Sequence, residues 1–147
     1  MFWIVTGCFG CLTMVILFVA LIGGGVFYWT RGAVDVVSTQ LTDLREGRID
    51  DAYGRLSQEY RARFSRPDFE RAIASHPSLK ENAEGRFWPP GGSVRIVNER
   101  GRVSGTVVSA SGQSEEAVFD VVKESGEWRI ASIEIGGAPL EAGALGP

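Results

Sequence analysis

Charged residues are absent from the first part of the chain: no Asp, Glu, Lys or Arg occurs between Phe2 and Trp29. At a rise of about 1.5 Å per residue, a helix over this stretch would exceed the hydrocarbon core of a bilayer, which is about 30 Å thick. Trp3 lies near one end of the stretch and Tyr28 near the other, where aromatic rings favour the membrane interface. The sequence therefore predicts a transmembrane helix over residues 2–29, with the lipid bilayer as a partner of the chain.

Cysteine is scarce and confined to this apolar stretch, where it occurs as Cys8 and Cys11. The segment that ends at Cys8 resembles a bacterial lipobox, but too few residues precede it and too many apolar residues follow it for a lipoprotein signal. The two cysteines share one helix face, and because the chain has a single His, we favour helix packing over redox or zinc chemistry. Acylation of either cysteine stays open as an alternative.

Basic residues are missing ahead of the apolar stretch, which disfavours a cleavable signal peptide. Only Arg31 follows it closely, so the charge asymmetry gives little information on orientation. The short N-terminal tail, which has no lysine, favours export of the residues that follow. We therefore expect a single-pass protein of the cell inner membrane whose domain lies outside the cytoplasm.

The remaining residues, 31–147, contain no Cys and one His, and they are enough for one compact domain. The chain has a net charge of −3 with both signs mixed, which excludes the basic footprint of a nucleic-acid-binding protein. No cluster of His, Cys and acidic residues has the spacing of metal ligands, and no glycine-rich phosphate loop follows a predicted strand. The sequence therefore predicts no catalytic, cofactor-binding or metal-binding residues, and no cofactor.

Apolar residues recur at helical spacing through the first half of this domain. Gly47 is expected to end a first helix, and a second helix is expected to begin near Ile49, with acidic residues in its first turn where the helix dipole favours them. The segment Ser65–Asp68 has the pattern of a helix N-cap with a proline in the first turn, and Pro77 is expected to end that helix. The sequence thus predicts three helices in this half.

The second half alternates apolar and polar residues, which is the pattern of strands with one covered face. Turn segments at residues 98–101, 111–113 and 125–126 separate four such runs and predict an antiparallel meander. In the last run, Trp128 and Ile130 share a face whereas Ile133 has the opposite phase, so a bulge or bend is expected near Ala131 and Ser132.

These elements predict an α+β protein, in which an N-terminal transmembrane helix precedes three helices packed on the concave face of a curved sheet. The sheet is expected to be an antiparallel meander of four strands or slightly more. The expected domains are the transmembrane helix over residues 2–29, an α+β domain over residues 31–136, and a flexible tail over residues 137–147, which is rich in Gly, Ala and Pro.

The segment Leu44–Leu56 joins the end of an apolar helix, a glycine-containing turn and a helix with the pattern Ala-Tyr-x-x-Leu-Ser. It resembles the nuclear-transport-factor-two-like and cystatin-like superfamily, in particular its membrane-anchored bacterial members, over about residues 33–136. The resemblance implies a cone-shaped α+β fold. Arg48 departs from the pattern, because such turns often carry an acid or Asn that caps the helix.

Some relatives in this superfamily are enzymes, ketosteroid isomerase among them, which use acids and tyrosines inside the cone. The resemblance makes Asp120, Tyr53 and His76 the candidates in this chain. A core position for Tyr53 and a helix-end or surface position for His76 are nevertheless the commoner outcomes for such residues. We therefore place no catalytic residue on this ground.

The function that we expect is a membrane-anchored, non-catalytic module that binds a protein partner or a small apolar ligand at the cell envelope. The alternatives are a small cone-cavity enzyme of the isomerase, dehydratase or hydrolase type, and a homodimerising structural element of an envelope complex. An open cavity with convergent polar groups and perturbed acids would favour the enzyme. An exposed apolar stripe on residues 103–110 and 117–122 would favour the dimer.

Overall fold

The computed structural model describes the backbone of residues 2–88 and 90–141, and it describes side-chain burial over residues 13–20, 30–88 and 90–141. The chain divides into two compact units, residues 1–31 and 32–147, which we describe separately. Helix α1 (Phe2–Arg45) begins in the first unit and ends in the second. All other elements, and the candidate functional site, belong to the second unit.

The predicted transmembrane helix over residues 2–29 has to be corrected. Among the residues whose side chains are described, no helix is both long and apolar enough to cross a membrane. The predictions for Cys8 and Cys11 fall outside the described side chains.

The helices that follow α1 are shorter and more numerous than predicted. They are α2 (Ile49–Gly54), α3 (Gln58–Arg63), α4 (Arg66–Ala74) and α5 (Pro77–Lys80). The expected second helix breaks after α2, because Leu56 forms a parallel bridge with Ile130 in the last long strand. Ser57 then starts α3 as its N-cap, and its hydroxyl accepts a hydrogen bond from the Tyr60 backbone N–H at 3.1 Å.

The predicted cap of the third helix is confirmed. Ser65 is the N-cap of α4, its hydroxyl accepts a hydrogen bond from the Asp68 backbone N–H, and Pro67 lies in the first turn. The helix ends at Ala74, and Pro77 lies in the first turn of the short helix α5. A proline therefore both follows α4 and begins the next helix, because its fixed φ and missing N–H suit a first turn.

The sheet has six antiparallel strands, two more than the four that the alternation predicted. They are β1 (Asn82–Arg86), β2 (Ser93–Val97), β3 (Arg100–Ser109), β4 (Ser114–Glu124), β5 (Glu127–Ile135) and β6 (Ala138–Pro139). Strands β1 and β2 both pair with β3, and the order continues through β4 and β5 to β6. Strand β1 lacks alternating apolar residues. Its first residue, Asn82, is instead fixed from outside the strand by donating to the carbonyls of Leu41 and Leu79 at 2.8 and 2.7 Å.

The predicted bulge in the last long strand is confirmed. Asp120 pairs with Ser132 and Val121 pairs with Ile130, so Ala131 is the extra residue of β5. The bulge places Ile130 and Ile133 among the fully buried residues in spite of their spacing. It also turns Ser132 toward the same face as Asp120, which matters for the site described below.

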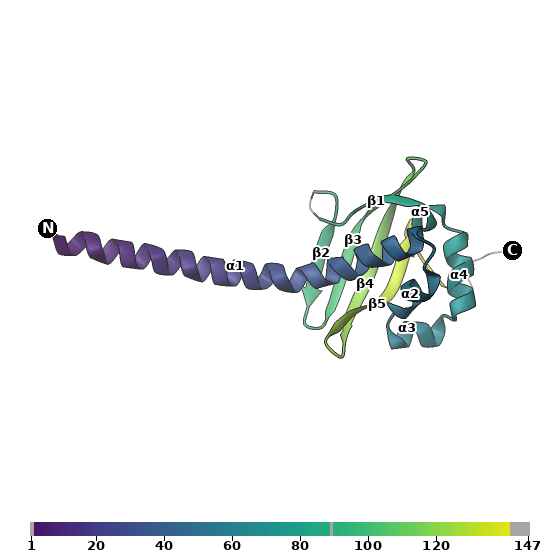
Figure 1. Cartoon of the computed structure of the whole chain (residues 1–147), viewed down its shortest axis with the longest axis horizontal. Coiled ribbons are helices and arrows are strands. Elements are labelled where there is room, and N and C mark those ends of the chain that lie inside the picture. Colours follow the sequence, from purple (N-terminus) through teal and green to yellow (C-terminus); the bar gives the residue numbers. More distant parts are fainter. Residues whose placement is uncertain (1, 89, 142–147) are drawn as a thin grey trace. The chain divides into compact units, whose positions relative to one another are not determined.

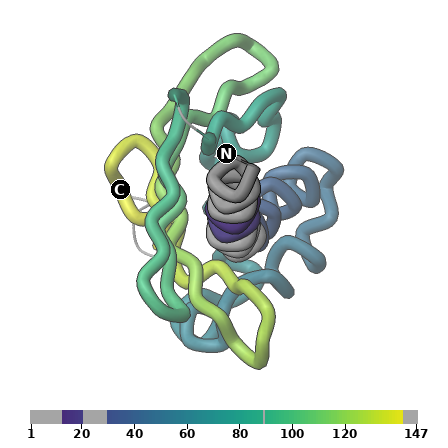
Figure 2. Tube along the Cα trace, turned by 90° about the vertical axis from the view of Figure 1, so that its left-hand side faces the viewer, coloured from purple at the N-terminus to yellow at the C-terminus, as the bar shows by residue number. Residues whose placement is uncertain are grey.

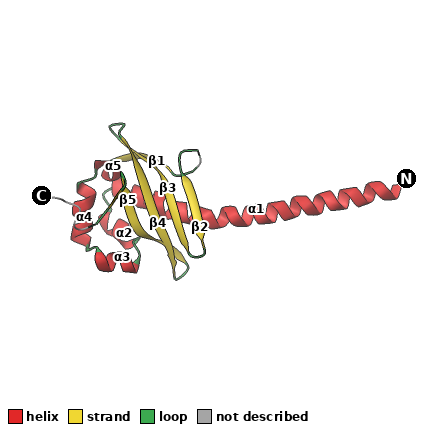
Figure 3. Cartoon of the chain, turned by 180° about the vertical axis from the view of Figure 1, so that it is seen from behind, coloured by secondary structure: helices red, strands yellow, loops and turns green. Residues whose placement is uncertain are grey.

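Helices cover one face of this sheet and leave the other open. In Figure 1 the C-terminal part of α1 passes in front of the strands, and in Figure 3, from behind, the strands lie in front. Figure 2 shows the strands on one side of the domain and the blue helical segments on the other. The covered face holds the apolar core, to which Val37 of α1, Phe69 of α4 and Phe119 of β4 contribute fully buried side chains.

A buried carboxylate joins the end of α1 to the next helix. Asp43 is 1% exposed, and its two oxygens accept hydrogen bonds from Arg48 Nε at 3.0 Å and from Arg55 Nε at 2.6 Å. Burial would raise the pKa of Asp43, but the hydrogen bonds from Arg55 and Arg48 outweigh it and hold the pKa below its ordinary value. Arg48, which departs from the superfamily pattern, therefore has a structural role in this turn.

The predicted flexible tail over residues 137–147 differs from the structure at its start. Ala138 and Pro139 form β6, and Leu140 is buried beyond it. The Tyr60 hydroxyl donates a hydrogen bond to the Leu140 carbonyl at 2.6 Å, which ties this segment to α3. The folded chain thus continues past residue 136, and residues 142–147 lie outside the described part.

Candidate functional site

The interior between the helices and the sheet is filled with side chains. Phe64, Phe69 and Phe119 are fully buried there, and the ring of Phe87 packs edge-on against Phe119 with centroids 5.7 Å apart. Core packing therefore occupies this interior in the part of the chain that the structure describes, which is where the resemblance would place a catalytic cone. A hollow lies instead on the open face of the sheet.

Two of the three candidate residues are engaged in structural contacts away from this hollow. The Tyr53 hydroxyl donates to the Phe64 carbonyl at 2.9 Å. The Tyr53 side chain is partly buried and packs against the apolar core. His76 Nδ1 lies 2.9 Å from the Ala72 carbonyl, at the junction of α4 and α5. These positions match the commoner outcomes expected for a core Tyr and a helix-end His.

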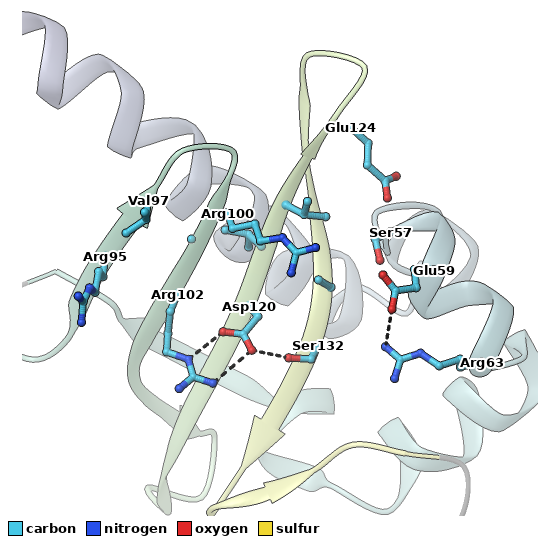
Figure 4. Close-up of a pocket in the computed structure, with 14 residues that line it drawn as sticks. Ser57, Glu59, Arg63, Arg95, Val97, Arg100, Arg102, Asp120, Glu124 and Ser132 are labelled. Atoms are coloured by element: carbon cyan, nitrogen blue, oxygen red, sulfur yellow. Dashed lines mark hydrogen bonds and ion pairs between the residues drawn. The ribbon is translucent and has the colours of Figure 1, made fainter.

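Asp120, the third candidate, lies on the open face in a row of polar residues that crosses four strands. The register places Arg95 of β2 opposite Arg102 of β3, Arg102 opposite Asp120 of β4, and Asp120 opposite Ser132 of β5. Arg102 binds the carboxylate through two nitrogens, with Nε–Oδ1 at 2.8 Å and Nη2–Oδ2 at 3.2 Å. The Ser132 hydroxyl donates to Oδ2 at 2.9 Å, as the dashed lines in Figure 4 show.

These contacts stabilise the ionised form of Asp120. The hydrogen bonds from Arg102 lower its pKa, partial burial opposes them, and the Ser132 hydroxyl adds to the lowering. A carboxyl group whose pKa lies below its ordinary value has given up its proton at neutral pH, and its oxygens are already occupied by donors. Asp120 is therefore suited to holding Arg102 in place and poorly suited to proton transfer near pH 7.

A groove of about 530 Å³ extends from this row toward α3. Its wall on the helical side comes from α3 and the residue before it, and its floor comes from β2 to β5 (Figure 4). The charged side chains that line it are Glu59, Arg63, Arg95, Arg100, Arg102, Asp120 and Glu124. Four arginines thus face three acids, in a chain whose net charge is −3.

The arginines of the groove differ in whether they have an anionic partner. Arg102 is bound by Asp120, and Arg63 lies 3.8 Å from the Glu59 carboxylate. Arg95 and Arg100 have no hydrogen bond or ion pair from their guanidinium groups to any residue that the structure describes. Two guanidinium groups of the groove, those of Arg95 and Arg100, therefore have no anionic partner among the described residues, whereas that of Arg102 is held by Asp120.

The acids of the groove are partly used by the fold. Glu124 accepts hydrogen bonds from the Gln58 backbone N–H, at 3.2 and 3.3 Å to its two oxygens, and so covers the N-terminus of α3. Over the described residues, no three His, Cys, Asp or Glu side chains gather in a way that could hold a metal ion. Because Glu124 and Asp120 are already hydrogen-bonded within the chain, the arginines are the charged groups of the groove most open to a ligand.

No protein-family model matches the chain, and no curated protein matches it in sequence. The architecture is α+β, with an antiparallel sheet covered by helices on one face, which is compatible with a cystatin-like fold. The resemblance to the nuclear-transport-factor-two-like and cystatin-like superfamily stays a prediction from the sequence.

The groove was not predicted from the sequence. Strand alternation places Arg95 between two inward apolar residues, and so indicates an outward side chain, but it does not say which residues of other strands lie next to it. The signal that was missed is the number of arginines on the outward positions of β2 and β3: Arg95, Arg100 and Arg102 all occur there within eight residues of chain.

Proposed function

We propose that this domain is a non-catalytic binding module that docks a protein partner on the open face of its sheet. The observation that carries the proposal is the groove of about 530 Å³ on a face that the helices leave uncovered. Concave sites with a few convergent polar groups are the usual binding sites of folded domains. The fixed Arg102–Asp120–Ser132 row gives this site a preorganised polar centre.

The enzyme alternative has weaker support, although the groove is open and polar and holds an acid of shifted pKa, because the pKa of Asp120 is lowered and not raised. Asp120 is ionised and fully engaged by donors, and Tyr53 and His76 are bonded to backbone carbonyls outside the groove. Ser132 donates to a carboxylate of lowered pKa, which makes that carboxylate a weak base for activating a hydroxyl. No described residue of the groove is therefore placed as a nucleophile with a competent base.

The other expectations can be weighed against the same surface. A small apolar ligand would have to leave the arginines and acids of the groove unpaired, which is unfavourable. A homodimer built on an apolar stripe over residues 103–110 and 117–122 would need apolar outward positions there, and these include Ser104, Thr106 and Asp120. A protein partner with its own polar groups fits the groove better than either.

We also propose that this docking takes place at the cell envelope, outside the cytoplasm. The support is that only one basic residue, Arg31, closely follows the uncharged stretch, so the charge bias that would hold the residues behind it in the cytoplasm is slight.

Site-specific photo-crosslinking in cells tests the docking proposal. A photoreactive residue is placed in the full chain at Val97 or Val122, which line the groove, and at Ala74, an exposed position on α4, as the control. We expect both groove positions to capture the same protein, identified by mass spectrometry, and the control to capture none of it. Equal capture at Ala74, or none at the groove positions, would contradict the proposal.

A further inference from the structure

The partner's chemistry follows from the two unpaired arginines of the groove. We infer that the partner presents an extended acidic peptide segment, whose carboxylates at alternate positions bind Arg95 and Arg100; this inference rests on the docking function proposed above. Each guanidinium is a planar fork that matches a carboxylate with two parallel hydrogen bonds.

Charge favours an anionic ligand at this place. Arg102 is already occupied by Asp120, whereas the guanidinium groups of Arg95 and Arg100 are exposed and have no anion bound to them among the described residues. The chain as a whole is acidic, so two free cations on one face are a local departure from its average. An acidic segment would be attracted to this face and repelled by much of the remaining surface.

The spacing of the two arginines matches that of an extended peptide. Arg95 lies opposite Arg102, and Arg100 precedes Arg102 by two residues on β3, so Arg95 and Arg100 are diagonal neighbours on adjacent strands. Diagonal neighbours on one face are about 7–8 Å apart. Side chains at alternate positions of an extended chain repeat every 6.6–6.8 Å or so, which brings two carboxylates within reach of the two forks.

Apolar side chains complete the surface beside Arg100. The register places Val97 of β2 on one side of Arg100 and Val122 of β4 on the other. Val97 is 59% exposed, and both valines line the groove. The methylene groups of a bound glutamate, or an apolar residue of the same segment, would cover these valines while the carboxylates pair with the arginines.

The acids around the groove favour a peptide over an anionic membrane or a nucleic acid. Glu59 and Glu124 lie in the groove itself, and Glu99 lies in the turn between β2 and β3. A continuous phosphate surface would meet these carboxylates at the same time as the arginines. A peptide places single charges at chosen positions and avoids such repulsion.

Peptide binding to the full chain tests the inference, with fluorescence anisotropy as the measurement. The probe is a labelled peptide of alternating glutamate and valine, and its matched control has glutamine in place of every glutamate. We expect the glutamate peptide to bind about tenfold tighter or more, because two charge-assisted pairs are lost with glutamine. Weaker binding at higher salt is expected for the glutamate peptide alone.

Variants of the chain locate the binding site. The double variant Arg95→Gln, Arg100→Gln should lose about tenfold or more of the affinity for the glutamate peptide. The double variant Arg45→Gln, Lys80→Gln makes the same change of net charge at exposed positions outside the groove, and should stay within about twofold. Circular dichroism spectra equal to that of the wild type would show that both variants fold. Arg95→Lys, Arg100→Lys keeps the charge without the fork and should bind with intermediate affinity.

Three outcomes would overturn the inference. The first is equal affinity of the chain for the two peptides, and the second is an equal loss of affinity for the glutamate peptide in the two double variants. The third is that Arg95→Gln, Arg100→Gln weakens binding to lipid vesicles alone. In the last case, vesicles of equal parts phosphatidylcholine and phosphatidylglycerol would bind in a way that needs Arg95 and Arg100, and the peptide would not. Capture of a protein from Val97 and Val122 would still support docking in each case. Peptide binding without any such capture would instead contradict the docking proposal.

Discussion

Replacing Asp43 by Asn is expected to destabilise the domain strongly, because this carboxylate is buried and holds two arginines. Asn has nearly the same shape but no charge, and one of its two terminal atoms is a donor. That NH2 group would face Arg48 or Arg55, both of which are also donors. The substitution therefore removes at least one of the three charge-assisted hydrogen bonds and weakens the others, while the size of the side chain is unchanged.

The magnitude follows from the exposure of the three partners. Breaking a buried ion pair by removing one partner costs about 3–5 kcal/mol when the remaining charge stays buried. Here the side chains left behind, Arg48 and Arg55, are 44% and 35% exposed, so they can turn toward water. We expect a loss of about 2–3 kcal/mol in the free energy of unfolding, between the value for a hydrogen bond to a charged group and that for a fully buried pair.

Thermal and urea unfolding of residues 32–147, the second compact unit, provide the measurement. For a domain of this size, the expected loss corresponds to a melting temperature lower by about 8–12 °C. The pKa of Asp43 lies below its ordinary value of 3.8 in the folded state, so the ion cluster stabilises the fold above that pH. The stability difference between wild type and Asp43→Asn should be full at pH 7 and shrink as the pH falls below about 3.8.

Asp50→Asn is the matched control. Asp50 also pairs with an arginine, Arg66 Nε at 2.5 Å, but its side chain is 81% exposed. Exposed pairs contribute little, because water and salt screen them. If the two substitutions lower the melting temperature equally, or if the difference at Asp43 does not depend on pH, burial of Asp43 is not the cause and the explanation above is wrong.

Three further predictions concern packing and location. Trp128→Ala should lower the free energy of unfolding by about 2 kcal/mol, because Trp128 is only half-buried where it packs over Gly32. This is less than the loss of about 3–5 kcal/mol for a fully buried aromatic residue. An unchanged urea midpoint would show that Trp128 makes no stabilising contact with the core. Gly105→Ala should lower the free energy of unfolding by about 2 kcal/mol or more, because the added Cβ would lie 2.2 Å from the Arg86 carbonyl oxygen and push β1 away from β3. Amide hydrogen exchange in β1 should become faster, and unchanged exchange there would argue against the clash. A reporter that is active only after export, fused behind Pro147, should be active, whereas activity of a cytoplasm-dependent reporter instead would reverse the proposed location.

Local patterns predicted those parts of the fold that depend on neighbouring residues. The Ser65 cap follows from residues within one turn, and the extra residue Ala131 follows from the change of phase between Ile130 and Ile133. The hairpin turns follow in the same way: Asn98 has a φ of 57°, the left-handed conformation that Asn tolerates better than most residues. In each case the residues on which the prediction rests are the same residues that form the structural feature.

Features formed by residues far apart in sequence were not predicted. The second helix breaks because Leu56 pairs with Ile130, and β1 forms because β3 is there to pair with it and Asn82 reaches Leu41. The chain end is held because Leu140 meets the Tyr60 hydroxyl. Each of these partners is at least 20 residues away, so no short window of the sequence contains both residues of a pair.

The candidate site belongs to this second kind. Alternation predicts that Asp120 has the opposite phase to Phe119, but both faces of a strand satisfy that pattern until the helices choose one. Once they cover the face of Phe119, Asp120 faces outward, and the register then decides that its neighbours are Arg102 and Ser132 rather than residues two positions away. A slip by two residues would keep every apolar side chain on the covered face and still take Asp120 away from Arg102. The core would tolerate that slip better than the site would. The arrangement of charges on the open face therefore depends on the strand register, which the turns and the bulge specify. A substitution that alters the bulge at Ala131 should disturb the groove before it disturbs the fold.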